Sequence, residues 1–138
     1  AVTVDLVDEN GVFMGGVIAP GFEISGDALR DGTAQLPKVS VDTPLHALGG
    51  TTEEAINAGL YWSTVGLIRM ITEKFAEEVQ RWPHTIVTGG NSEIIKKDCP
   101  FVDSWVPNLV VKGVVLAYKK HLDAKAELEQ LAEEDKQQ

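Results

Sequence analysis

The sequence predicts an α/β fold, in which a β-hairpin is followed by two helices, a short strand and a last helix. Apolar and polar residues alternate over residues 1–8, which is the period of a strand. Apolar residues recur at helical spacing after Thr51, and a short apolar run ends at the pair Gly89 and Gly90. The length of 138 residues and the 43% apolar content fit one domain with one compact core.

The hairpin is the first predicted element. Asn10 and Gly11 form its turn, because both residue types tolerate a positive φ. Gly15 and Gly16 interrupt the second strand, which favours a β-bulge or the close approach of another backbone or a ligand.

A short helix and a long loop are predicted next. The apolar spacing of residues 22–31 fits a helix that Gly32 ends. Residues 33–50 are rich in Pro, Thr, Ser and Gly and have no sustained period, so they predict an ordered loop with a short strand from Val39 to Val41. Loops of this length are usually functional or disordered.

The long helix begins at a capping box. Thr51 can accept a hydrogen bond from the backbone while Glu54 reaches back, and the apolar pattern then continues toward Val79. Small residues in the first half of this helix allow another helix or subunit to approach closely. They are Ala55, Ala58, Gly59, Ser63 and Gly66.

The second half of the chain contains a strand, a glycine turn and two helices. Residues 85–88 read as a short strand of the buried type, and a polar helix is predicted over residues 93–97 after the glycines. A last helix with an apolar stripe opens at Pro107 and Asn108. The charged residues 121–138 are predicted to extend this helix as a solvated tail.

Composition excludes several classes of protein. The formal net charge of −9 opposes binding to nucleic acid or to an anionic membrane surface. Cys99 is the single cysteine, which excludes an intrachain disulfide and a multi-cysteine zinc site and fits a reducing cytoplasm. The three histidines lie far apart in the sequence, so no metal site is predicted, and no apolar run is long enough to span a membrane. Because the first residues already form a strand without an initiator Met, we expect a further segment before Ala1.

Two places have the residue types of a binding site. Gly89 and Gly90 after a strand could let the backbone touch a ligand or could simply make a tight turn, and no GxGxxG or Walker motif accompanies them. Thr51 and Thr52 stand at a helix N-terminus, where they could cap the helix, bind an anionic ligand, or divide the two roles.

Taken in order, these segments resemble the C-terminal half of type III pantothenate kinase, also called the Bvg accessory factor family, which belongs to the actin, sugar-kinase and Hsp70 ATPase superfamily. The resemblance covers nearly the whole chain up to the tail. It is carried by Ala1-Val2-Thr3-Val4-Asp5, Gly15-Gly16-Val17-Ile18-Ala19-Pro20-Gly21, Ala28-Leu29, Thr33-Ala34-Gln35-Leu36-Pro37, Gly49-Gly50-Thr51-Thr52, Ala55-Ile56, Gly59, Thr88-Gly89-Gly90 and Leu109-Val110-Val111-Lys112-Gly113.

The resemblance implies an activity and a set of partners. Residues 1–120 would be the C-terminal lobe of an actin-like ATPase (ribonuclease H-like) fold, followed by the tail of residues 121–138. The activity would be ATP-dependent phosphorylation of pantothenate to 4'-phosphopantothenate, the first step of coenzyme A biosynthesis, in a cytoplasmic homodimer. Potassium or ammonium would accompany the phosphates, and magnesium the nucleotide.

The resemblance also assigns roles to individual residues. Thr52 would contact pantothenate at the dimer interface, and Thr88, Gly89 and Gly90 would form the adenosine-side motif of the nucleotide site. Gly50 and Thr51 stand where the family often has Lys and Asn, so the loop before Thr52 departs from the family pattern.

The motifs that carry catalysis in the family, DxGNT, GxDR and DxGT, would all lie upstream of Ala1 and are not in this sequence. The chain therefore contains no predicted catalytic residue, and we expect it to be inactive by itself. The alternative is a non-catalytic regulatory or dimerisation module of the same family.

Overall fold

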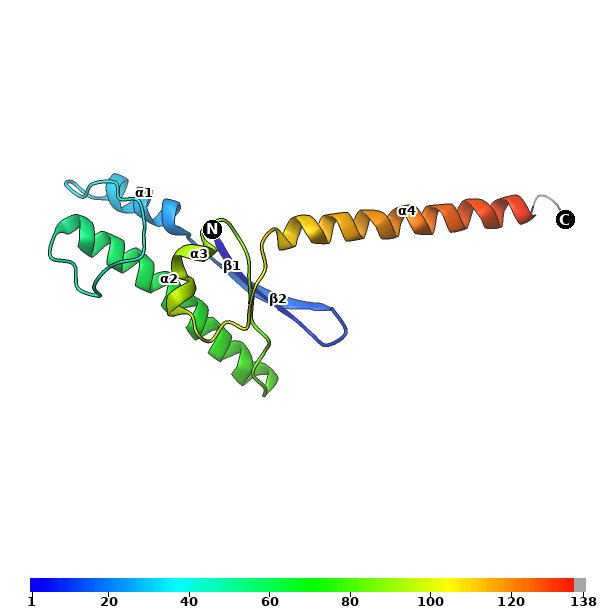
Figure 1. The fold of residues 1–138 in the computed structure, drawn as a ribbon, viewed down its shortest axis with the longest axis horizontal. Coiled ribbons are helices and arrows are strands. Elements are labelled where there is room, and N and C mark those ends of the chain that lie inside the picture. The colour runs from blue at the N-terminus through cyan, green and yellow to red at the C-terminus, as the bar shows by residue number, and fades with distance from the viewer. Residues whose placement is uncertain (136–138) are drawn as a thin grey trace.

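The computed structural model describes residues 1–135 and shows a mixed α/β fold with small sheets and two long helices (Figure 1). Two strand pairs form separate sheets, the antiparallel pair β1 and β2 and the parallel pair β3 and β4. The elements are β1 (Val2–Val7), β2 (Phe13–Ala19), α1 (Phe22–Gly32), α2 (Thr52–Val79), β3 (Ile86–Val87), α3 (Ser92–Ile95), the 3-10 helix η1 (Lys96–Asp98), β4 (Ser104–Trp105) and α4 (Leu109–Asp135).

The hairpin of β1 and β2 confirms the predicted turn and bulge. Gly11 has a φ of 79°, as a turn of this kind requires. The register skips one residue between Leu6 and Val7, so that β2 bulges beside Gly15, which has a φ of 137°. A Cβ on Gly16 would lie 2.7 Å from the carbonyl oxygen of Val4, so the second glycine is required by the close approach of the partner strand.

The loop before α2 contains no strand at residues 39–41, so this part of the prediction is wrong. Polar contacts hold the loop instead of a strand ladder. The Asp42 amide donates to Asn57 Oδ1 at 2.9 Å, and the Thr43 hydroxyl donates to the Ile94 carbonyl at 2.9 Å. These contacts join segments far apart in the sequence, and a local pattern of apolar residues does not report them.

Helix α2 has the predicted limits. Thr51 Oγ1 accepts from the Glu54 amide at 3.2 Å, and Glu54 Oε2 accepts from the Thr51 amide at 3.2 Å, which completes the capping box. At the other end, Gln80 takes a left-handed conformation and its amide donates to the Ala76 carbonyl. The helix is therefore closed at both ends by local interactions.

The second sheet is smaller and more exposed than the predicted buried strand of residues 85–88. Only Ile86 and Val87 are strand residues, and Ile86 is 48% exposed. Their partner, β4, was not predicted, because two residues give no period to read. The polar helix expected over residues 93–97 is present as α3 followed by η1.

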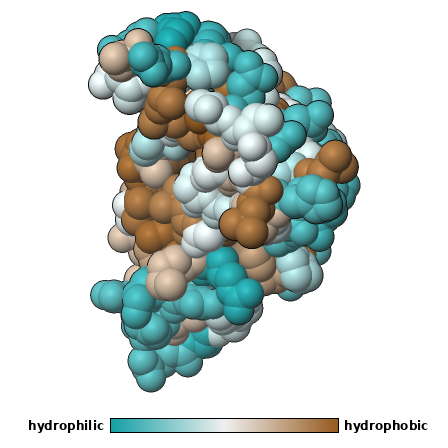
Figure 2. All heavy atoms as spheres, turned by 90° about the vertical axis from the view of Figure 1, so that its left-hand side faces the viewer, coloured by the Kyte–Doolittle hydropathy of each residue, from teal (hydrophilic) through white to brown (hydrophobic). Residues whose placement is uncertain are grey.

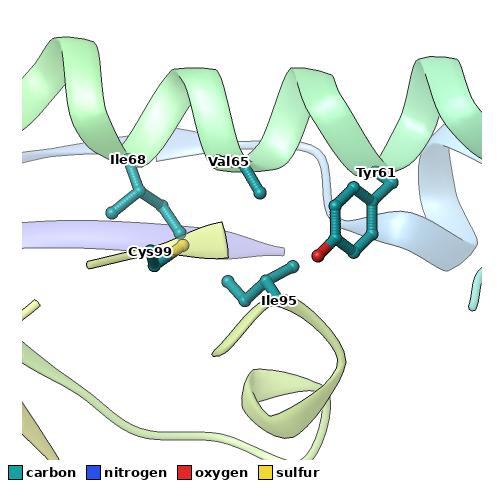
Figure 3. Packing of buried hydrophobic residues seen from close by; sticks show 5 residues of the cluster. All are labelled: Tyr61, Val65, Ile68, Ile95 and Cys99. Atoms are coloured by element: carbon teal, nitrogen blue, oxygen red, sulfur yellow. The ribbon is translucent and has the colours of Figure 1, made fainter. Parts of the chain in front are cut away.

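One cluster of buried side chains holds these elements together (Figure 3). Tyr61, Val65 and Ile68 point from one face of α2 toward Ile95 and Cys99, which lie at and just after the α3–η1 segment. Partly buried apolar residues from the hairpin, α1, α3, the loops and β4 pack around this cluster. They are Val2, Phe22, Val41, Ile94, Phe101, Val102 and Trp105.

Helix α4 projects away from the rest of the described chain (Figure 1). Every side chain of residues 109–127 is exposed. The expected domain limit at residue 120 stays a prediction, since α4 runs through it without a break, and residues 136–138 of the predicted tail lie outside the described residues. Seen from the end that carries α1 and the loop before α2, apolar residues also form patches on the surface (Figure 2).

Within residues 1–135, none of the helices combines the length and the apolar character that crossing a membrane needs.

Candidate functional site

The turn after β3 is built around Thr88, Gly89 and Gly90. Gly89 has a φ of 119°, a conformation that favours glycine, and its carbonyl accepts from the Ser92 hydroxyl at 2.7 Å. The Thr88 hydroxyl accepts from the Leu109 amide at 3.4 Å, which joins the turn to the first residue of α4. The backbone of the turn is thus fixed on both sides by hydrogen bonds.

This turn forms one wall of a cavity of about 420 Å³. The lining residues come from the turn, the start of α3 and the segment between β4 and α4. They are Thr88, Gly89, Gly90, Ser92, Glu93, Trp105, Val106, Pro107, Asn108, Leu109, Val110 and Val111. A volume of this size is in the range of small-molecule sites.

The two glycines differ in what the described chain requires of them. Gly89 needs its left-handed backbone, which is the requirement of a tight turn. Gly90 has no positive φ, and a Cβ built on it would meet no heavy atom within 4 Å. Neither strain nor crowding in the described residues therefore requires a glycine at position 90.

Thr52 occupies the first turn of α2 with an exposed side chain. The capping role belongs to Thr51, whose hydroxyl binds the Glu54 amide. The two threonines therefore divide the roles that the sequence left open, and the Thr52 side chain is accessible to a ligand or to another chain. Thr52 lines neither of the two cavities described here, so it is not brought together with the turn of residues 88–90.

A hydrogen-bonded link between α2 and η1 was not found from the sequence. The side chain of Tyr61 is fully buried, and its hydroxyl donates a hydrogen bond to Asp98 Oδ2 at a distance of 2.5 Å. Burial, followed by the hydrogen bond and the negative charge of Asp98, raises the pKa of Tyr61 above its ordinary value. No local motif marks this pair, because its members are separated by 37 positions.

The wall formed by residues 105–111 was also missed. Trp105 carries the positive charge of Lys96 near its face, with Nζ 5.9 Å from the ring centroid. Among the residues that line the cavity, Glu93 is the one titratable side chain. Lys96 Nζ lies 3.2 Å from Glu93 Oε1, so the charge of Glu93 is paired and the rest of the lining is uncharged.

A second cavity of about 220 Å³ lies between α1, residues 38–41 and the start of α3. Asp27 and Lys38 form an ion pair of 2.9 Å at its edge, and Asn91 also lines it. Nothing in the sequence pointed to these residues as a site.

Metal-binding side chains do not gather in the part of the chain that is described. Within residues 1–135, no group of three or more His, Cys, Asp or Glu could hold a metal ion. Residues for the expected potassium or ammonium ion and for magnesium are therefore not assigned here.

Comparison of the sequence with known proteins finds a family model and curated relatives that match this chain. The family model described as type III pantothenate kinase matches residues 1–74. The type III pantothenate kinase of Agathobacter rectalis is 40% identical over 121 residues, which are 87% of this chain and 46% of that protein. The relative from Zymomonas mobilis is 34% identical over 127 residues, covering 91% of this chain and 46% of its own length. The relative from Gluconobacter oxydans is 37% identical over 116 residues, 84% of this chain and 43% of its own length.

The chain therefore spans a little less than half the length of these curated relatives. The family model covers more than half of the chain, including both strands of the hairpin, α1 and the capped start of α2. These matches place the chain in the type III pantothenate kinase family.

Proposed function

We propose that this chain is the C-terminal half of an enzyme that phosphorylates pantothenate with ATP, giving 4'-phosphopantothenate in the first step of coenzyme A biosynthesis. The observation that carries the proposal is family membership together with the open cavity at Thr88, Gly89 and Gly90. The relatives are named type III pantothenate kinase, and the cavity lies at the turn that the family resemblance assigns to the nucleoside.

In this proposal the turn of residues 88–90 holds the adenosine part of ATP. The mostly uncharged lining fits a nucleoside, and the space before Gly90 lets the nucleoside lie against the backbone. Thr52 offers its exposed hydroxyl to pantothenate at the interface of a homodimer. The fold would be the C-terminal lobe of an actin-like ATPase, and the enzyme would act in the cytoplasm.

Phosphoryl transfer needs a carboxylate that accepts the proton of the attacking hydroxyl and positive charge around the transferring group. The cavity lining supplies Glu93 but no Lys or Arg. Because the motifs that carry catalysis in the family are not in this sequence, we assign the catalytic carboxylate, the potassium or ammonium ion and magnesium to the part of the relatives that this chain does not match. The chain alone is expected to be inactive.

The test is reconstitution. The chain is mixed or co-expressed with the N-terminal half of the Agathobacter rectalis relative, and pantothenate-dependent release of ADP is measured. We expect turnover from the mixture and none from either half. Turnover by the chain alone would contradict the assignment of the catalytic carboxylate, and a folded complex that binds neither ATP nor pantothenate would overturn the proposed activity.

The alternative, a dimerisation module without catalytic function, is favoured by the open face of α2. A Cβ on Gly59 or Gly66 would meet no heavy atom within 4 Å, so a second helix has room there. A stable dimer whose melting temperature does not respond to pantothenate would favour this alternative over the kinase.

A further inference from the structure

The loop before α2 is joined to the segment that follows the glycine turn, residues 88–90. The Thr43 hydroxyl donates to the Ile94 carbonyl at 2.9 Å, and the two residues are 51 positions apart in the sequence. Ile94 belongs to α3, the helix that starts at Ser92, just after the turn. The bond therefore holds the loop that leads to Thr52 against the segment that leads away from the glycine turn.

A second bond joins α2 itself to the same segment. The Tyr61 hydroxyl donates to Asp98 Oδ2 in η1 at 2.5 Å, and the side chain points from α2 toward the α3–η1 segment (Figure 3). Thr43 also lies close enough to the Tyr61 hydroxyl to affect its pKa, so the two bonds meet at one place. Because α2 starts at Thr52, both segments that position Thr52 are bound to α3–η1.

Shorter contacts extend these two bonds at either end. The Asp42 amide donates to Asn57 Oδ1 at 2.9 Å, which joins the loop to the first half of α2. The Ser92 hydroxyl donates to the Gly89 carbonyl at 2.7 Å, which joins α3 to the glycine turn. A continuous set of hydrogen bonds and short helices thus runs from the glycine turn to the loop and helix that carry Thr52.

The loop depends on such contacts because it has no regular structure of its own. Residues 36–44 form neither helix nor strand. Between Thr43 and the capping box at Thr51, Leu45 is 94% exposed and Leu48 is 88% exposed. This stretch is therefore held mainly at its two ends, by the Thr43 bond and by the capping box. A ligand that orders one of two joined segments lowers the entropy that a second ligand loses at the other segment.

We propose that Thr43 and Tyr61 are positioning residues that couple the two substrate sites, so that a nucleotide held at the glycine turn orders the loop before Thr52 for pantothenate. The coupling acts in both directions by the same factor. The identity of the two ligands rests on the proposed function, whereas the physical link between the turn and the loop does not. The link lies within one chain, so it acts in the same way for pantothenate bound in either protomer of a dimer.

Three threonine variants provide a matched test. Thr43→Val removes the hydroxyl and keeps the shape of the side chain, whereas Thr43→Ser keeps the hydroxyl. Thr72→Val is the control, because the Thr72 hydroxyl donates at 2.8 Å to the Ile68 carbonyl of its own helix. Tyr61→Phe removes the second bond. None of the substituted residues lines the cavity at the glycine turn. All comparisons are made well below the lowest melting temperature of the set.

The first measurement uses the chain alone and tests the physical link. Hydrogen exchange is followed by mass spectrometry in residues 42–50 and 88–95. We expect Thr43→Val to speed exchange in both segments by about fivefold, the effect of losing one hydrogen bond. Thr43→Ser and Thr72→Val should leave exchange in these two segments unchanged. Exchange that Thr43→Val speeds in the loop alone, or in neither segment, overturns the link.

The second measurement uses the complex with the N-terminal half of the Agathobacter rectalis relative. Calorimetry gives the Kd of pantothenate with and without ADP, a nucleotide that has no phosphoryl group to transfer to pantothenate. We expect ADP to lower this Kd by a factor of about 5 or more in the unchanged chain, the lower end of common coupling between sites. Thr43→Ser and Thr72→Val should keep this factor. Thr43→Val and Tyr61→Phe should bring it close to 1 while the Kd of ADP alone changes by less than about twofold.

The outcomes separate the coupling from the proposed function. Coupling that persists in Thr43→Val, or that is lost equally in Thr72→Val, overturns the role of Thr43, and so does a loss that Thr43→Ser fails to rescue. An unchanged chain in which ADP does not affect pantothenate binding overturns the coupling. A complex that binds neither ligand overturns the proposed function and the coupling of substrates, while the exchange data still decide the link between the two segments.

Discussion

At the scale of single residues, the hydrogen bond of Tyr61 to Asp98 joins α2 to the segment that follows the glycine turn. Tyr61→Phe removes the donor and leaves the Asp98 carboxylate, which is 28% exposed, with water as its replacement partner. Because hydrogen bonds to charged groups contribute about 1.5–3 kcal/mol and water recovers part of this, we expect a loss of roughly 1–2 kcal/mol in the free energy of unfolding. Urea denaturation measures it.

The matched control is Tyr118→Phe on α4, where the residue is 63% exposed and the change in unfolding free energy should be close to zero. An equal effect of the two substitutions would show that the Tyr61 hydroxyl does not stabilise the fold.

The same phenol makes stability depend on alkaline pH. Folding raises the pKa of Tyr61 above its ordinary value of 10.0, mainly through burial. Above pH 10 the unfolded chain loses this proton while the folded chain keeps it, so the folded state holds more protons and stability falls as the pH rises. We expect the free energy of unfolding to drop by up to about 1.4 kcal/mol per pH unit from this group, a slope that Tyr61→Phe removes. Denaturation curves between pH 9 and about pH 11.5 provide the measurement, and a slope unchanged in the variant would contradict it.

Cys99 is predicted to be an unreactive thiol in the folded chain. It is 1% exposed, and burial together with the charge of Asp98 raises its pKa from 9.0 to about 11. Since the thiolate is the reactive form, a rise of this size lowers the thiolate fraction at pH 8 by a factor of about 100. Alkylation by iodoacetamide should be slower by at least this factor in the native chain than in urea. Native labelling at the rate of the unfolded chain would show that the cluster around Cys99 opens.

At the scale of elements, two adjacent threonines at the start of α2 have different expected roles: Thr51 stabilises the helix and Thr52 binds substrate. Thr51→Ala removes the hydroxyl that caps the Glu54 amide and should lower the free energy of unfolding by about 1 kcal/mol. Thr52→Ala removes an exposed hydroxyl that the capping box does not use, so the unfolding free energy should change by less than about 0.5 kcal/mol. In the reconstituted enzyme, Thr52→Ala should instead raise the KM for pantothenate. The assignment fails if Thr51→Ala alone affects this KM.

Local signals predicted the elements whose causes lie within a few residues. The capping box of Thr51 and Glu54 and the hairpin turn at Gly11 are both confirmed, because each depends on hydrogen bonds or backbone angles of adjacent residues. Strand β4 and the missing strand at residues 39–41 depend on partners far along the chain. Their pairing is decided by tertiary contacts that a single sequence does not reveal.

For the same reason, the sequence indicated one wall of the candidate site and not the opposite wall. Gly89 and Gly90 follow a strand directly, which is a readable pattern, and the structure finds them in the wall of a cavity. The opposite wall is formed by residues 105–111, which become neighbours of the turn only through the pairing of β3 with β4 and the contact of Leu109 with Thr88. The presence of Pro107 and Asn108 correctly indicated where α4 begins. It did not indicate that the first residues of α4 line the cavity.

At the scale of the whole molecule, the single compact core expected from composition accounts for only part of the chain. One buried cluster is present, but α4 lies outside it with its apolar stripe exposed. The apolar content of 43% is therefore divided between a core and surfaces that other chains or segments can cover. Composition gives the number of apolar residues in the chain, but it does not identify the chain or segment that covers those left exposed.

The open face of α2 leads to a prediction about assembly. Gly59 is exposed in the first half of the helix, and a Cβ there would meet no atom of the described chain within 4 Å. Gly59→Leu should therefore raise the free energy of unfolding of the protomer by about 0.5–1 kcal/mol, since glycine is a poor helix former. If two copies pack closely along this face, the same substitution should abolish the dimer. Gly113→Leu on α4, also without atoms within 4 Å, should raise helix stability similarly and leave the dimer intact. Sedimentation of both variants measures the dimer, and urea denaturation measures the stability of the protomer. A close helix contact has no room for a leucine at position 59, so a dimer that survives Gly59→Leu would place the interface elsewhere.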